Sequence, residues 1–242
     1  MSKNIAHRGA SGYYPENTML AFEKAIEMGC DGIETDVHLT KDGIAVICHD
    51  ETIDRTTDGN GFIKDYTYEE LLRFDAGIKF GDKFKGLKIP SLDEFIDLIK
   101  NRDLIINFEL KDDKIKYKDI EKIVLDKIYK AKIEDNSIIS SFNHYSVMKC
   151  RELDKNIKTG FLYDNQLYDP GSYGKRAGVY ALHPNYITLE DDIVENIKNS
   201  NLKINTYTVN EEKDMTRLAK LGIDGIITNY PDKLKTILDC LK

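Results

Sequence analysis

Strand-like and helix-like segments alternate about eight times along the 242 residues of this chain, and this alternation restricts the fold more than any other feature. Two neighbouring parallel strands need a long crossover between them, which is usually a helix. Eight such units in a chain of this length favour an α/β protein built as a closed parallel (β/α)8 barrel, a TIM barrel. A doubly wound open sheet is the alternative, but the sequence has no G-x-G-x-x-G turn for a dinucleotide.

The expected elements follow from apolar periodicity and from capping residues. Ser91 with Glu94 three residues later predicts a capping box at the start of a helix. A Tyr- and Gly-containing segment that runs through residue 178 is assigned neither helix nor strand. Strands are expected at 4–9, 32–38, 44–48, 104–111, 137–142, 158–163, 179–183, 203–209 and 225–228, and helices from Thr18 to about 28 and at 92–100, 120–132, 145–153, 191–199, 211–221 and 232–241.

Residues 51–89 depart from this rhythm. Turn-forming residues fill 56–61, only a short helix is expected near 68–72, and Gly77, Gly81 and Gly86 interrupt the rest. We therefore expect one catalytic barrel domain over 1–242, with 51–89 as an insertion subdomain after the second strand.

The overall charge and the apolar runs exclude several classes of protein. The formal net charge is −7 and no basic tract stands out, so no nucleic-acid partner is expected. Apolar runs are far too short to span a bilayer, and no apolar signal core follows the first residue, so we expect a cytoplasmic protein without stable membrane association. Nothing indicates an oligomeric state. The cysteines lack metal-binding spacing and are expected to be reduced and mostly buried: Cys30, Cys48, Cys150 and Cys240.

Glu34 and Asp36 stand one residue apart on a buried strand, so both side chains point the same way. Two close carboxylates repel each other unless a proton or a cation lies between them, and a hard divalent cation suits oxygen ligands. The alternative to a metal site is that this pair lies on a solvated or salt-bridged edge of the strand. His49 follows the next strand and is expected nearby. His38 has the same parity as Asp36 and is either a further ligand or a supporting residue.

A barrel would bring the polar residues that follow its strands to one face, where active sites lie. Polar residues follow most of the expected strands, and their consistent position favours the metal-site interpretation. They are His7, Arg8, Glu34, Asp36, Glu109, Lys111, Ser141, Asn143, Tyr207, Asn210, Thr228 and Asn229.

A specific set of motifs occurs along nearly the whole chain. It comprises His7-Arg8-Gly9, Pro15-Glu16-Asn17-Thr18, Glu34-Thr35-Asp36-Val37, Lys41-Asp42-Gly43, His49-Asp50, Asp54-Arg55-Thr56-Thr57, Phe108-Glu109-Leu110-Lys111, Ser140-Ser141-Phe142 and Tyr207-Thr208-Val209-Asn210. With these motifs the chain resembles the glycerophosphodiester phosphodiesterase family. One departure is Tyr207, where many members have tryptophan; either aromatic side chain can wall a pocket.

The resemblance implies a TIM barrel with a small insertion, and hydrolysis of glycerophosphodiesters to sn-glycerol 3-phosphate and an alcohol. It implies that Glu34, Asp36 and Glu109 hold one divalent metal. Such oxygen ligands favour Mg²⁺ or Ca²⁺ over Zn²⁺. The remaining implied roles are acid–base catalysis by His7 and His49, phosphate contacts by Arg8 and Lys111, and substrate contacts by Phe142 and Tyr207.

The chemistry of the substrate suggests how two histidines would be used. A hydroxyl lies on the carbon beside the phosphate ester and is already tethered for attack on phosphorus. One histidine would deprotonate this hydroxyl and the other would protonate the departing alcohol, giving a cyclic phosphate; the sequence does not say which does which. Alternatives are a phospholipase-like enzyme acting on lipids and a non-catalytic barrel that binds glycerophosphodiesters. A nucleotide phosphotransferase is disfavoured because no P-loop motif occurs.

Overall fold

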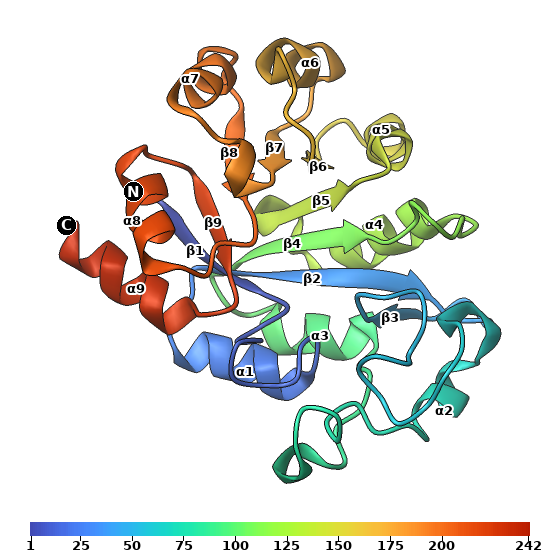
Figure 1. Cartoon of the computed structure of the whole chain (residues 1–242). Coiled ribbons are helices and arrows are strands. Elements are labelled where there is room, and N and C mark those ends of the chain that lie inside the picture. The colour runs from blue at the N-terminus through green and yellow to red at the C-terminus, as the bar shows by residue number, and fades with distance from the viewer.

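The computed structural model describes all residues from 1 to 242, and its chain alternates between strands and helices as expected (Figure 1). The strands are β1 (Lys3–His7), β2 (Gly32–Leu39), β3 (Ala45–Ile47), β4 (Ile105–Leu110), β5 (Ser137–Ser141), β6 (Lys158–Tyr163), β7 (Ala181–Pro184), β8 (Lys203–Thr206) and β9 (Gly225–Thr228). The α-helices are α1 (Met19–Glu27), α2 (Tyr68–Leu71), α3 (Leu92–Ile99), α4 (Ile120–Ala131), α5 (His144–Leu153), α6 (Pro170–Ala177), α7 (Asp191–Asn199), α8 (Glu212–Lys220) and α9 (Pro231–Cys240). Short 3₁₀ turns are η1 (Ile63–Asp65), η2 (Asp82–Phe84), η3 (Glu134–Asn136) and η4 (Tyr186–Thr188).

Eight parallel strands close into a barrel in the order β1-β9-β8-β7-β6-β5-β4-β2, and pairing of β1 with β2 completes the ring. The remaining strand, β3, pairs antiparallel with the end of β2 and lies outside the ring. The structure thus confirms the predicted TIM barrel, with helices around the outside (Figure 1).

Strand β2 shows how local sequence produces this arrangement. Every residue of its sequence GIETDVHL is buried, as expected for a strand covered on both faces. Ile33 and Val37 belong to the apolar layer that also contains Phe22 of α1 and Phe95 of α3. The alternate residues Gly32, Glu34 and Asp36 face the barrel interior because side chains in a strand alternate between its two faces.

Most predicted elements are confirmed to within a few residues, and the capping box at Ser91 and Glu94 is present at α3. Helix α6 was not predicted. Its signals are local: Asp169 caps it by accepting from the backbone N–H of Ser172, Pro170 occupies the first turn, and Gly178 ends it with a φ of 69°. Internal glycines conceal these signals because they lower helix propensity. Gly174 is required by packing, since a Cβ there would lie 2.7 Å from Leu202.

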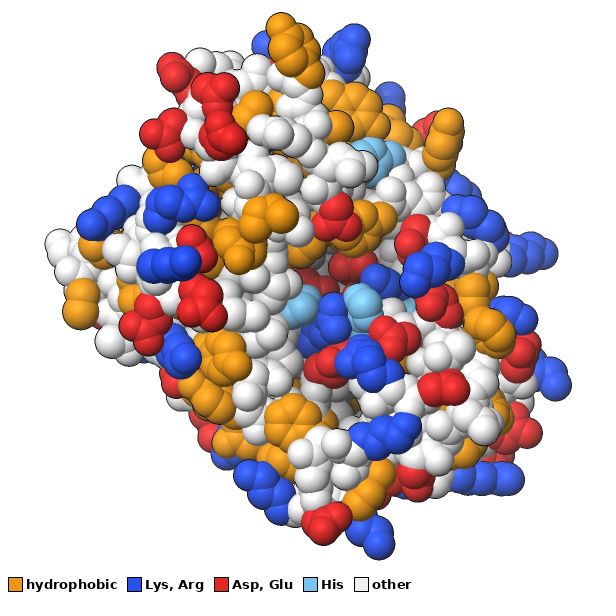
Figure 2. Space-filling view, in the orientation of Figure 1, with side chains coloured by type: hydrophobic (Ala, Val, Ile, Leu, Met, Phe, Trp, Pro, Cys, Tyr) orange, Lys and Arg blue, Asp and Glu red, His pale blue; other side chains and the backbone are white.

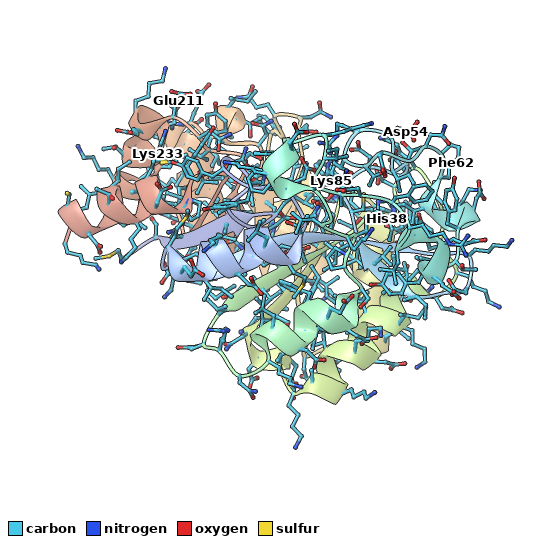
Figure 3. The ribbon with its side chains drawn as sticks, turned by 90° about the horizontal axis from the view of Figure 1, so that it is seen from below. His38, Asp54, Phe62, Lys85, Glu211 and Lys233 are labelled. Carbon is cyan, nitrogen blue, oxygen red and sulfur yellow. The ribbon has the colours of Figure 1, made fainter.

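The segment between β3 and α3 leaves the barrel and contains only η1, α2 and η2. Seven buried residues give it a small apolar cluster of its own: Val46, Cys48, Ile53, Ile63, Leu71, Ala76 and Ile89. Figure 3 shows its residues Asp54 and Phe62 on the same side of the molecule as His38, and opposite Glu211 and Lys233. The insertion is therefore attached at one side of the barrel, beside the end of β2.

Two further findings concern the thiols and the helices. All four cysteines are free thiols, and three of them are buried while Cys240 is exposed. No helix has the length and apolar character required to cross a bilayer.

Candidate active site

A small cavity of about 160 Å³ opens where the carboxyl ends of the barrel strands meet. Figure 2 shows this region as a hollow in which histidine, acidic and basic side chains gather. The cavity is lined by His7, Arg8, Glu34, His49, Asn107, Glu109, Phe142, Leu162, Asp164, Tyr207, Thr208 and Ile227. Seven of the nine residues singled out from the sequence line it; Asp36 and Lys111 lie directly behind it, in contact with Arg8 and Glu109 respectively.

Three carboxylates form the floor of the site. Oxygen atoms of Glu34, Asp36 and Glu109 lie within 4.8 Å of one another, and all three residues are buried. The register of the barrel causes this convergence, because Asp36 of β2 is paired directly with Glu109 of β4. Glu34 lies on the same face of β2 as Asp36, two residues earlier.

Two cations partly balance these carboxylates. Nζ of Lys111 lies 2.7 Å from Oε1 of Glu109 and 3.7 Å from Oδ1 of Asp36. Nε of Arg8 lies 3.2 Å from Oδ2 of Asp36. Burial opposes ionisation of Asp36, but Arg8 and Lys111 together hold the pKa of this carboxyl below its usual value.

The pKa values of Glu34 and Glu109 shift upward, opposite to that of Asp36. Burial first, and then the negative charges of Asp36 and Glu109, raise the pKa of Glu34 well above its usual value. Burial also raises the pKa of Glu109, although Lys111 opposes the shift. Oε1 of Glu34 and Oδ1 of Asp36 are buried and accept no hydrogen bond. Unsatisfied buried carboxylate oxygens at this spacing are what a divalent cation with oxygen ligands requires, so the residues fit such an ion.

His7 ends β1 and is held by the end of β9. Its Nδ1 donates to the side-chain oxygen of Asn229 over 2.6 Å, so Nε2 is left to face Oε2 of Glu34 at 3.8 Å. Burial and the charge of Arg8 lower the pKa of His7 to about 3. The ring is therefore neutral around pH 7 and offers a free nitrogen lone pair to the cavity.

His49 follows β3 and approaches from the insertion side. Its Nδ1 donates to Oδ1 of Asp50 over 2.6 Å, which leaves Nε2 free. His38 is not among the clustered carboxylates; its ring accepts from Tyr117 and its Nε2 donates to the backbone oxygen of His49 at 3.2 Å. His38 therefore supports the backbone of His49, and the structure does not place it as a metal ligand.

A chain of alternating charges connects the insertion to the carboxylates; we call it the ion-pair chain. Arg55 donates to both oxygens of Glu16 at 2.7 and 2.8 Å, and its Nε donates to Asp50 at 2.7 Å. Glu16 in turn accepts from Arg8 at 2.9 Å, and Arg8 reaches Asp36. Arg55, which is exposed, thus connects Asp50, the partner of His49, to Glu16. Glu16 in turn holds Arg8, the residue that contacts Asp36.

The two aromatic residues expected to contact substrate lie together at the mouth of the cavity. The rings of Phe142 and Tyr207 pack edge to face with centroids 6.0 Å apart. The hydroxyl of Tyr207 donates to Oδ1 of Asp164 at 2.9 Å. This bond fixes the tyrosine in a position where it walls the side of the cavity opposite the carboxylates of β2.

The sequence-based prediction assigned no contact to several residues that hold the site. Asn17, with a φ of 57°, donates to Oδ2 of Asp36 at 2.8 Å, and Asn229 holds His7. Asp50 and Arg55 form the ion-pair chain. Asn17, Asp50 and Arg55 belong to the motifs quoted above and Asn229 follows the last strand, but no motif tells which partner a side chain contacts across the barrel.

Comparisons with known proteins agree with this geometry. A model of the glycerophosphoryl diester phosphodiesterase family matches residues 7–233. A glycerophosphodiester phosphodiesterase of Caldanaerobacter subterraneus is 46% identical over 95% of both chains, and one of Bacillus altitudinis is 40% identical over the full length of both. A phosphodiesterase of Oleispira antarctica, solved with the product sn-glycerol-3-phosphate, is 30% identical with a TM-score of 0.89, covering 97% of this chain and 96% of that one. The chain therefore belongs to the glycerophosphoryl diester phosphodiesterase family of enzymes.

Proposed function

We propose that this enzyme hydrolyses glycerophosphodiesters of the choline, ethanolamine or glycerol type to sn-glycerol 3-phosphate and an alcohol, with one divalent cation. The observation that carries the proposal is the shared cavity: two imidazoles with free Nε2 atoms face three buried carboxylates and Arg8. The relative from Oleispira antarctica was solved with sn-glycerol-3-phosphate, which supports this compound as the product here.

Glu34, Asp36 and Glu109 would hold the cation, Mg²⁺ or Ca²⁺. Three ionised carboxylates with Arg8 and Lys111 leave this floor with a net charge of −1. A divalent ion would reverse that sign to +1 and so attract a phosphodiester, which carries one negative charge. When bound, the ion supplies Lewis acidity to a phosphate oxygen and to the adjacent hydroxyl.

Arg8 and Lys111 are proposed to stabilise negative charge on the phosphate. Lys111 is buried and Arg8 is mostly buried, and in this setting an electrostatic contact is stronger than it is in water. The nearby carboxylates hold the pKa of both side chains above the usual values in spite of burial, so both remain cationic throughout the working pH range. They would continue to neutralise the phosphate as charge builds on its oxygens in the transition state.

We assign His7 as the initial base and His49 as the initial acid. Nδ1 of His7 donates to the side-chain oxygen of Asn229, so Nε2 carries the lone pair that can accept the proton of the substrate hydroxyl. Nδ1 of His49 donates to the carboxylate of Asp50, which fixes the ring so that Nε2 faces the cavity and can deliver a proton to the departing alcohol. The tethered hydroxyl then attacks phosphorus, and the roles reverse when water opens the resulting cyclic phosphate.

Metal dependence is the direct test. We expect EDTA to abolish hydrolysis of glycerophosphocholine and added Mg²⁺ or Ca²⁺ to restore it, because the three carboxylates need a counter-charge. Equilibrium dialysis should show one bound ion in the wild type and much weaker binding in Glu109→Gln, with Glu121→Gln, another buried glutamate, as the control. Full activity in a metal-free sample would refute the requirement.

The cyclic phosphate is tested with a substrate that lacks the attacking group. The 2-deoxy analogue of glycerophosphocholine keeps the phosphate and the leaving alcohol, so it should bind yet be turned over at least ~10²-fold more slowly, since it loses the proximity advantage. Equal kcat for the two compounds, with oxygen from ¹⁸O-water incorporated in a single step, would show direct attack by water. The expected cytoplasmic location and the absence of a nucleic-acid partner remain predictions from the sequence.

A further inference from the structure

A second and larger cavity adjoins the catalytic cavity. Its volume is about 600 Å³, against about 160 Å³ for the catalytic cavity. Phe142, Leu162 and Asp164 line both, so the two spaces are neighbours that share a wall. The second cavity lies over the ends of β5 and β6, toward α5 and α6, where apolar side chains border the hollow in Figure 2.

The walls of this cavity are largely aromatic and apolar. In addition to the three shared residues it is lined by His144, Tyr163, Asn165, Leu167, Tyr168, Asp169, Tyr173 and Arg176. His144 stacks on Phe161 with ring centroids 4.0 Å apart, and Phe161 packs against Tyr173 at 5.3 Å. This stack supports the wall and gives it a defined shape.

His144 does not bring positive charge into the cavity. Its Nε2 donates to the backbone oxygen of Leu162 at 2.9 Å, and its Nδ1 accepts from the hydroxyl of Tyr173 at 2.8 Å. Both ring nitrogens are used in the way that a neutral imidazole requires. The ring therefore acts as an uncharged, flat part of the wall.

A carboxylate stands at the junction of the two cavities. Oδ1 of Asp164 accepts from Tyr207 at 2.9 Å and from Asn185 at 3.3 Å, whereas Oδ2 accepts no hydrogen bond. Asp169 and Arg176 also line the cavity, and hydrogen bonds from Asn196 and Ser172 lower the pKa of Asp169. Two carboxylates and one guanidinium leave the lining with a net charge of −1.

We propose that this second cavity, the alcohol subsite, binds the departing alcohol and selects alcohols that carry an ammonium group. The proposal rests on the function proposed above and adds the class of leaving group. A positively charged ammonium would contact the free oxygen of Asp164 while its methyl or methylene groups pack on the aromatic faces. Choline and ethanolamine fit this description, and choline fits it best because its charge is spread over apolar methyl groups.

Other leaving groups match the lining less well. A glycerol or inositol head group needs several hydrogen bonds, and the largely aromatic and apolar walls offer few. An anionic head group would be repelled by Asp164. An acyl chain would fit the apolar walls but would gain nothing from the carboxylate of Asp164. Binding an acyl chain beside this carboxylate would also remove water from the charge, which is unfavourable.

The experiment compares kcat/KM for glycerophosphocholine and glycerophosphoglycerol, two diesters that differ only in the leaving alcohol. We expect the wild type to prefer glycerophosphocholine by at least ~10-fold, and Asp164→Asn to remove most of this preference by raising KM for glycerophosphocholine. Phe142→Leu keeps an apolar wall but removes an aromatic face, so it should lower the preference several-fold. Asp97→Asn, an exposed carboxylate on α3, is the control and should leave both substrates unaffected.

The outcomes separate this inference from the proposed function. Turnover of both diesters with a ratio that Asp164→Asn does not change would overturn the alcohol subsite and leave the enzyme activity standing. Preferred turnover of glycerophosphoglycerol or of an acylated lysophospholipid would overturn it in favour of a polyol or lipid site. If the wild type hydrolyses neither diester, the proposed function fails. Calorimetry with choline chloride then tests the alcohol subsite by itself. Equal binding of choline to the wild type and to Asp164→Asn would overturn the alcohol subsite.

Discussion

At the residue scale, the two histidines that we propose to be catalytic differ in what holds them. His7 donates to an uncharged amide, whereas His49 donates to the carboxylate of Asp50, which is held in turn by Arg55. Burial opposes ionisation of Asp50, but the hydrogen bonds from Arg55 and His49 lower its pKa to about 2. The carboxylate of Asp50 is therefore ionised around pH 7 and orients His49, whereas an uncharged amide orients His7.

Asp50→Asn tests this difference. The amide keeps the shape but can also present an N–H to Nδ1 of His49, which selects the wrong tautomer of the ring, so we expect kcat to fall by ~10²-fold or more with little change in KM. His7→Ala and His49→Ala should each lower kcat by about 10²–10⁴-fold, the range for acid–base groups. Asp65→Asn, an exposed carboxylate in the insertion, is the matched control.

A double variant makes the test stricter. If Asp50 acts through His49, His49→Ala combined with Asp50→Asn should be no slower than His49→Ala alone, because residues that act as a unit are not additive. Additive losses would show that Asp50 contributes by another route.

At the element scale, the insertion supplies part of the site although it forms no barrel strand. Arg55 is the member of the ion-pair chain that the insertion supplies. It contacts Glu16, which precedes α1, and Asp50, which follows β3. It is about half exposed. Exposed ion pairs contribute only about 0.2–1 kcal/mol to stability, so the value of this arginine lies in positioning rather than in holding the fold together.

Arg55→Gln should therefore separate activity from stability. We expect kcat/KM to fall by roughly 10²-fold, since a 1 Å displacement of reacting groups costs about that much, while the melting temperature falls by only a few degrees. Arg55→Lys should recover little, because an ammonium cannot donate to two carboxylates in a fixed fork. Arg73→Gln, also in the insertion but without an ion pair, serves as the control. A large loss of stability with unchanged kcat/KM would assign Arg55 a structural role.

At the scale of the whole molecule, the barrel interior beneath the site is polar. His183 of β7 is fully buried, accepts from Asn205 at 3.1 Å, and has no partner for Nδ1. Burial lowers its pKa to about 3. We propose that residues 1–242 unfold as one unit with 51–89 as a subdomain, because the apolar cluster of the insertion includes Val46 of β3. His183 then affects the stability of the whole chain.

This histidine should make the protein less stable in acid. Between pH 6.5 and about 3 the unfolded chain binds a proton at residue 183 that the folded chain excludes. The contribution of His183 to the free energy of unfolding is therefore complete above pH 6.5 and is lost as pH falls toward 3. The loss amounts to about 1.4 kcal/mol per pH unit at full slope. His183→Gln keeps an acceptor for Asn205 but does not titrate, so denaturant titrations from pH 7 to 4 should show a shallower decline. An unchanged slope would contradict the shift.

The sequence alone determined the barrel and the convergence of the carboxylates. Both depend on local periodicity: the alternation of strand and helix predicts parallel crossovers, and the two-residue period of β2 places Glu34 and Asp36 on one face. The resemblance to a family added Glu109, His7 and His49 to the candidate site. Capping signals at Ser91 and Glu94 were also readable, because their partners lie within one helical turn.

Only the tertiary structure revealed α6, the ion-pair chain and the alcohol subsite. Glycines hid α6, because they lower helix propensity; at Gly174 the missing side chain leaves room for Leu182 and Leu202. Glu16, Asp50 and Arg55 meet because an aperiodic insertion returns to the barrel mouth, a path that no periodic pattern encodes. Likewise, Asp164 follows β6 and accepts from Tyr207, which follows β8, so residues after two strands that are not neighbours meet at the junction of the cavities. Contacts between distant segments depend on the path of the folded chain, and local sequence patterns do not contain that path.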